Sequence, residues 1–103
     1  MYAAMIEIGW MKQVVEGESA NAIIDAISRY QDFGCLVTMA KQRESSYTYS
    51  KLKAFVDKYR ERALTMDDIK NLDIGLSIGS IRCHGIAEGD DEIEKLKEKA
   101  KDI

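Results

Sequence analysis

The stretch DIGLSIGSIRCHGI, residues 73–86, decides the fold class of this 103-residue chain. Gly79-Ser80 forms a two-residue link between two runs of β-forming residues, and Gly in the first position suits a type II′ hairpin turn. This turn pairs Ile78 with Ile81, and the same pairing separates apolar from polar side chains. We therefore predict a β-hairpin over residues 73–86. Its apolar face consists of Ile74, Leu76, Ile78, Ile81 and Cys83.

Helical patterns lie on both sides of this hairpin. Residues 19–32, 50–63 and 90–103 each place apolar side chains at intervals of three and four, and a capping residue begins each segment. A shorter pattern opens at Thr65 with the signature of a capping box. We expect one α+β domain over residues 1–103, small and mostly helical, with a single β-hairpin.

The N-terminal segment, residues 2–16, fits two structures. Ile6, Trp10 and Val14 recur at helical spacing, whereas residues 2–8 also alternate as a strand would. We favour the helix because the run ends at a glycine, which commonly terminates helices. The segment is apolar nearly all round, so either it is deeply buried or another chain covers it. From the second case we predict an interface for a protein partner or a second copy, formed by Ile6, Trp10 and Val14.

Composition excludes several classes of protein. No run approaches the ~20 apolar residues of a membrane helix, and the first apolar stretch lacks the basic start and cleavage site of a secretory signal. Two cysteines are too few for a disulfide framework, and with one histidine they do not supply the four ligands of a structural zinc site. We expect a cytoplasmic protein with no metal, no cofactor and no membrane partner.

The neighbours Cys83 and His84 suggest a thiol nucleophile with its base. Adjacent residues of a strand point to opposite faces, however, so these two side chains cannot share a proton. The glycines of the C-terminal third lack the lysine and the strand–glycine–helix order of a phosphate-binding loop. We therefore expect no enzymatic activity.

A basic segment interrupts an acidic chain. The net charge is -3, yet residues 35–65 hold seven basic and three acidic residues. Residues 41–53 combine cations with hydroxyl groups and two tyrosines, which suit phosphate contacts and base stacking. We predict a non-enzymatic binding protein that contacts DNA or RNA through residues 41–62. The expected contacts are Lys41, Arg43, Ser46, Tyr47, Lys51, Lys53 and, on the hairpin, Arg82. The alternative is a protein-interaction module, an inhibitor or assembly subunit, that uses the apolar N-terminal segment.

The order of these elements resembles the layout of winged helix DNA-binding domains. In that layout Ala40 would be the small residue of the supporting helix, residues 46–53 would begin the recognition helix, and the Gly79 turn would tip the wing. Glu44 and Ser45 depart from the pattern, because such motifs favour a turn glycine followed by a buried apolar residue. The resemblance implies that the basic segment faces DNA.

Overall fold

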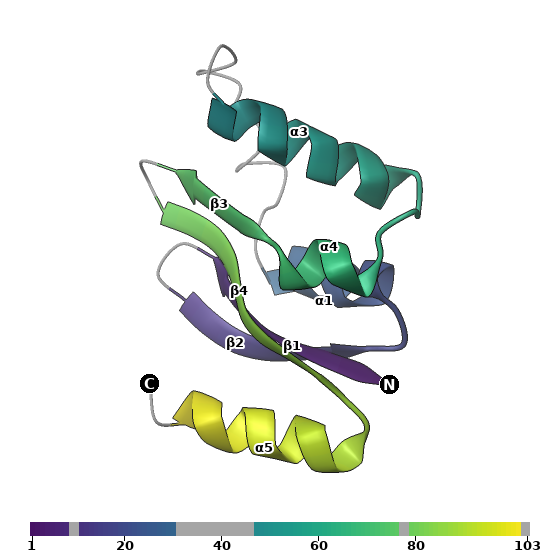
Figure 1. Ribbon diagram of the computed structural model, residues 1–103, viewed down its shortest axis with the longest axis vertical. Helices are drawn as coiled ribbons and strands as arrows, with labels where there is room; N and C mark the ends of the chain where they lie inside the picture. The colour runs from purple at the N-terminus through teal and green to yellow at the C-terminus, as the bar shows by residue number, and fades with distance from the viewer. Residues whose placement is uncertain (9–10, 31–46, 77–78, 102–103) are drawn as a thin grey trace.

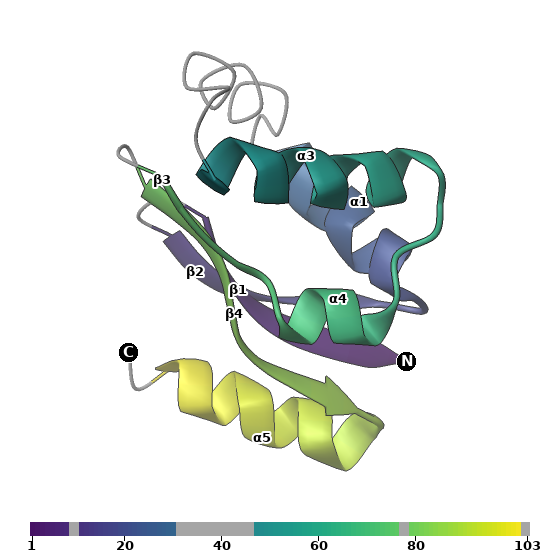
Figure 2. The same cartoon turned by 45° about the horizontal axis from the view of Figure 1, so that its top comes forward.

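The computed structural model describes residues 1–8, 11–30, 47–76 and 79–101 (Figure 1). The described elements are, in order, β1 (Tyr2–Ile8), β2 (Met11–Gly17), α1 (Ala20–Tyr30), α3 (Tyr47–Arg60), α4 (Met66–Lys70), β3 (Asp73–Leu76), β4 (Gly79–Glu88) and α5 (Asp90–Lys101). The four strands form one antiparallel sheet in the order β2-β1-β4-β3. Helices α1, α3 and α4 cover one face of this sheet and α5 covers part of the other (Figures 1 and 2). The predicted α+β class is therefore confirmed.

Residues 2–17 form a β-hairpin, so the predicted N-terminal helix is wrong. β1 pairs with β2 from Tyr2 opposite Gly17 to Ile8 opposite Met11. The strand-like alternation of residues 2–8 was thus the correct signal. The described chain therefore has two hairpins rather than one, and they join through β1 and β4 at the centre of the sheet.

The apolar character of β1 on both sides follows from its central position. Strands that are covered on both faces lose the polar half of their alternation. Ala4 and Ile6 belong to the core beneath α1, α3 and α4, and we call this side of the sheet the three-helix face. Ala3 and Met5 pack in a second cluster with Ile93 and Leu96 of α5, and we call that side the α5 face.

The predicted C-terminal hairpin is present, but its register differs by four residues. Ile81 pairs with Ile74, whereas the turn at Gly79 predicted a pair with Ile78. The link between β3 and β4 is thus residues 77–78, which lie outside the described residues. A shift by an even number of residues leaves each side chain on its face. Ile74 and Ile81 accordingly remain buried together, as the sequence predicted.

The helices α1 and α3 supply most of the three-helix core. α1 begins as predicted, since the Ser19 Oγ accepts a hydrogen bond from the Ala22 N–H at 3.1 Å. α3 begins at Tyr47, three residues before the predicted start at Ser50, and it ends at Arg60. The predicted stripes are buried at Ile23, Ile24 and Ile27 of α1 and at Leu52, Phe55 and Val56 of α3.

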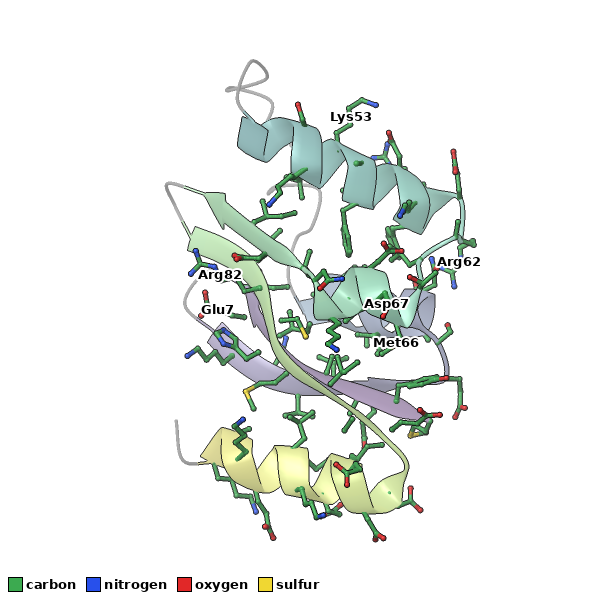
Figure 3. All side chains as sticks on the ribbon, viewed as in Figure 1. Glu7, Lys53, Arg62, Met66, Asp67 and Arg82 are labelled. Atoms are coloured by element: carbon green, nitrogen blue, oxygen red, sulfur yellow. The ribbon has the colours of Figure 1, made fainter. Side chains whose placement is uncertain are left out.

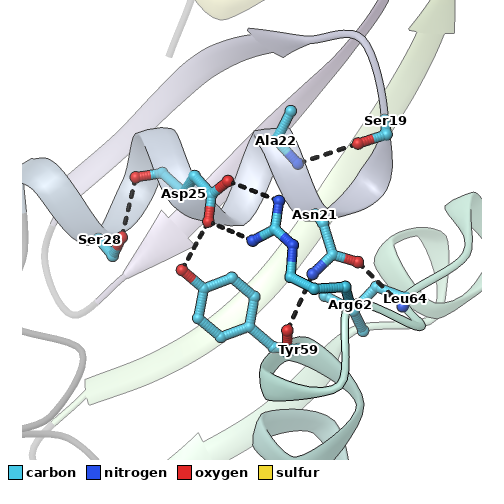
Figure 4. Close-up of polar contacts among 8 residues, drawn as sticks. All are labelled: Ser19, Asn21, Ala22, Asp25, Ser28, Tyr59, Arg62 and Leu64. Atoms are coloured by element: carbon cyan, nitrogen blue, oxygen red, sulfur yellow. Dashed lines mark hydrogen bonds and ion pairs between the residues drawn. The ribbon is translucent and has the colours of Figure 1, made fainter.

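The C-terminal end of α3 is a Schellman motif without glycine. The N–H groups of Arg62 and Ala63 donate to the carbonyls of Tyr59 and Lys58 at 3.1 and 2.9 Å. Arg62 takes the left-handed position with φ 60, where a non-glycine residue is uncommon. Its guanidinium forms a bidentate pair with Asp25 of α1, at 2.9 and 3.0 Å (Figure 4). This carboxylate raises the pKa of Arg62.

Three further hydrogen bonds attach α1 to this helix end. The Tyr59 hydroxyl donates to Asp25 at 2.7 Å. The Asn21 side chain donates from Nδ2 to the Tyr59 carbonyl at 2.9 Å and accepts from the Leu64 N–H at 3.0 Å (Figure 4). Asn21 is 5% exposed, so this polar side chain is buried with both ends satisfied.

The capping box predicted at Thr65 is present. The Thr65 Oγ1 accepts from the Asp68 N–H at 3.2 Å, and the Asp68 carboxylate accepts from the Thr65 N–H at 2.9 Å. This backbone hydrogen bond, helped by Lys58, lowers the pKa of Asp68. At α5 the cap differs from the prediction: the Gly89 carbonyl accepts the first helical bond, and Asp90 lies within the first turn.

Candidate functional site

β4 contains a β-bulge at His84. Ile6 of β1 pairs with Cys83 and Met5 pairs with Gly85, so His84 is the extra residue. Bulges change the direction of a side chain and are frequent beside binding sites. The bulge also lies where β3 leaves the sheet, because the β3–β4 ladder extends only to Arg82. Beyond that point the Cys83 N–H donates to the Leu72 carbonyl at 2.9 Å.

A row of alternating charges crosses the four strands beside this bulge. Asp73 pairs with Arg82, Arg82 with Glu7, and Glu7 with Lys12 in the strand registers. The row lies on the α5 face, since Glu7 is two residues from Met5 on β1. Figure 3 shows Glu7 and Arg82 at the same end of the sheet. The Arg82 Nε donates to the Asp73 carboxylate at 2.7 Å.

His84 contacts the middle of this row. Its Nε2 lies 3.1 Å from Oε1 of Glu7, and the Lys12 Nζ lies 4.0 Å from the same oxygen. An ionised carboxylate only accepts, so a proton on Nε2 makes this hydrogen bond. The Glu7 side chain is 16% exposed against 34% for His84. The largely buried Glu7 carboxylate therefore fixes the position of the His84 imidazole.

A shallow pocket of about 370 Å³ adjoins His84, and we call it the bulge pocket. It lies where the end of α4, the start of β3 and the bulged part of β4 meet. Its charged groups are two cations, one carboxylate and the imidazole. It is lined by Lys70, Asn71, Leu72, Asp73, Arg82, Cys83 and His84.

The Cys83 thiol does not share a proton with His84. Cys83 is half-buried and packs against the three-helix core, and its Sγ donates to the Gly85 carbonyl at 3.4 Å. Burial raises the pKa of this thiol, which opposes formation of the thiolate. The predicted separation of the two neighbouring side chains is confirmed, because Cys83 and His84 contact different partners.

Native Cys83 should therefore react slowly with thiol reagents. In a Cys35→Ser background, labelling at about pH 7.5 should be at least ~10-fold slower in buffer than in urea, because the thiolate fraction is small and access is restricted. The absorbance of the coloured thiolate that the reagent releases measures the labelling rate in buffer and in urea. Equal rates in the two conditions would show that Cys83 is not held against the core.

Three of the predicted nucleic-acid contacts, Lys51, Lys53 and Arg82, lie among the described residues. Lys51 and Lys53 are exposed on α3, and Lys53 points away from the sheet (Figure 3). Arg82 lies on the α5 face of the sheet, opposite to the face that α3 covers. The structure therefore separates Arg82 from the two lysines. Lys41, Arg43, Ser46 and the side chain of Tyr47 lie outside the described residues.

The predicted protein interface also changes. Ile6 is 0% exposed and belongs to the three-helix core, so its side chain is not available to a partner. Val14 is half-buried and packs against the cluster beneath α5. Trp10 lies outside the described residues.

Sequence reasoning missed most of the charged row. Glu7 and Lys12 fell inside the segment predicted as a helix, and in a helix their spacing of five residues places them on different faces. In a hairpin the same residues are directly opposite. Asp73 began the predicted hairpin, but the predicted register placed Ser77 rather than Asp73 opposite Arg82. The strand-like alternation of apolar residues in 2–8 was the one signal for a hairpin, and a hairpin would have placed Glu7 opposite Lys12.

Comparison with protein-family models, with curated proteins and with solved structures finds no match for this chain. Among the described residues, no helix combines the length and the apolar composition needed to cross a membrane. The same residues contain no group of three or more His, Cys, Asp or Glu side chains placed to hold a metal ion.

Proposed function

We propose that the chain is a small, cytoplasmic, non-enzymatic protein that binds nucleic acid through residues 41–62. The distribution of charge in space carries this proposal. α3 is the outermost layer at one end of the 42 Å long axis, and α5 lies at the other end (Figure 1). α3 carries four basic residues and one acidic residue, whereas α5 carries four basic and five acidic residues. The more basic of these two helices thus forms the proposed binding surface.

The ion pairs of α3 are compatible with binding to phosphates. Lys53 contacts Asp57 at 2.8 Å, and Lys58 contacts Asp68 at 3.0 Å. Exposed pairs of this kind contribute only ~0–1 kcal/mol, so a phosphate can compete for the lysine. A few such contacts supply a weak affinity that depends on salt.

The winged helix resemblance extends this proposal. In such an arrangement α3, beginning at Tyr47, is the recognition helix, and the β3–β4 hairpin is the wing. The non-enzymatic part is supported by the Cys83 thiol, which is half-buried and has a raised pKa.

A salt titration tests the proposal. Labelled duplex DNA and RNA should bind at about 50 mM salt and weaken at about 200 mM, with a slope of log K against log salt of about -2 to -4. Lys51→Ala and Lys41→Ala should each flatten this slope by about one unit. Lys99→Ala on α5 is the matched control, since it removes an exposed lysine at the opposite end. It should leave the slope unchanged.

Two outcomes would contradict the proposal. One is the absence of binding at the lower salt concentration. The other is binding that does not depend on salt, because the proposed contacts are mostly ionic.

The alternative is a protein-interaction module that acts as an inhibitor or assembly subunit, and one of its three predicted interface residues is not accessible. Ile6 is buried, and among the described residues Met1 and Ile86 are the large exposed hydrophobic side chains. Trp10 and Val14 remain. A stable dimer in light scattering that Trp10→Ala dissociates would favour this alternative.

A further inference from the structure

We propose that the bulge pocket binds a small oxyanion, a phosphate or carboxylate group, through Arg82 and Lys70, with His84 as a fixed wall of the site. This site lies apart from α3, because Arg82 is on the other side of the sheet from that helix. The proposal rests on the charge of the pocket, on the way its donors are held and on its size.

The charge of the lining favours an anion. Lys70 and Arg82 contribute two positive charges to the lining and Asp73 one negative charge, while the Glu7 carboxylate that contacts His84 lies 4.0 Å from the Lys12 ammonium. The Asp73 carboxylate binds the Nε of Arg82 at 2.7 Å. A guanidinium has five N–H donors, so the two terminal nitrogens keep the planar fork that matches a carboxylate or a phosphate. Asp73 therefore orients this fork.

His84 is also held before a ligand arrives. The bulge makes it the extra residue of β4, and the Glu7 carboxylate lies 3.1 Å from its Nε2. Because Glu7 accepts the Nε2 proton, His84 forms a fixed wall of the pocket, and the charged donors to an anion are Arg82 and Lys70. The amide of Asn71 adds a further donor at the end of α4.

The size of the pocket restricts the ligand. A volume of about 370 Å³ lies at the lower end of the range for small-molecule sites, and the pocket is shallow. Such a site accommodates one anionic group with a small substituent. We therefore expect affinities in the millimolar range, near ~1–10 mM.

An NMR titration of the ¹⁵N-labelled full chain tests the proposal, with sodium phosphate, sodium acetate and, at matched ionic strength, sodium chloride. Phosphate or acetate should give saturable shifts of the Arg82 Nε–H and of the amides around residues 70–73 and 82–84. Arg82→Gln should weaken binding by about tenfold or more, and Arg82→Lys should be intermediate because it keeps the charge but not the fork. Arg60→Gln, an exposed arginine on α3, is the control and should bind normally.

Two results would overturn the proposal. The first is equal shifts with chloride, which would show screening rather than a site. The second is unchanged affinity in Arg82→Gln. If Arg82→Gln does not fold, the exposed Lys70→Gln replaces it, and unchanged affinity in that variant would have the same meaning. Saturation by phosphate but not acetate assigns the site to phosphate groups, and the reverse assigns it to carboxylates.

Discussion

Replacing Ile6 by Ala should lower the free energy of unfolding by about 3 kcal/mol, within the range of ~2–5 kcal/mol for large-to-small changes at buried sites. Ile6 is 0% exposed at the centre of β1, where the three-helix core meets the sheet. Removing three carbon atoms there leaves a cavity that neighbouring strands and helices cannot fill. Urea denaturation followed by circular dichroism measures the change.

Ile86→Ala is the matched control for this prediction. Ile86 is also in the sheet, on β4, but it is 37% exposed, so its loss should cost under about 1 kcal/mol. If Ile6→Ala left stability unchanged and instead altered the oligomeric state, Ile6 would be an interface residue after all. Analytical ultracentrifugation of the same variant measures that state.

Replacing Asn21 by Ala should destabilise the fold by about 2–4 kcal/mol. The change removes two hydrogen bonds that attach α1 to the end of α3, and it leaves the buried Leu64 N–H without a partner. An unsatisfied buried donor costs ~1–3 kcal/mol in addition to the lost contacts. Thermal and urea unfolding of the variant measure the effect.

Two variants of α1 define this prediction more sharply. Asn21→Asp keeps the acceptor for Leu64 but places a buried carboxylate against the Tyr59 carbonyl, so it should destabilise the fold at least as much as Asn21→Ala. Ser28→Ala removes a bond within the same helix, to the Asp25 carbonyl at 2.8 Å, and should cost under about 1 kcal/mol. Equal effects of Asn21→Ala and Ser28→Ala would show that the attachment of α1 to α3 is not important.

The candidate site depended on the register, which the sequence predicted poorly. The Gly79 turn indicated a hairpin with Ile78 opposite Ile81, but Ile74 holds that position. Ile74, Ile81 and Cys83 kept their predicted face because the error was an even number of residues. The bulge at His84 could not be predicted from local sequence, since it appears only when β4 pairs with β1.

The sequence alone determined the features that depend on neighbours along the chain. Ser19 caps α1, Thr65 opens the capping box of α4, and the 3.6-residue period identifies the buried stripes of the helices. These are local because helix hydrogen bonds and caps join residues three or four apart. Sequence patterning therefore predicted where the main helices lie and which sides they bury.

Only the tertiary structure decided the state of residues 2–17 and the position of the charged groups. Periodicity in residues 2–8 was ambiguous because both faces of a central strand are apolar, which removes the contrast that distinguishes strand from helix. Burial between the three-helix layer and α5 selects the strand. The row from Asp73 to Lys12 and the bulge pocket then follow, because strands distant in sequence pair side by side. Contacts between residues so far apart in the sequence are determined by the packing of the whole domain.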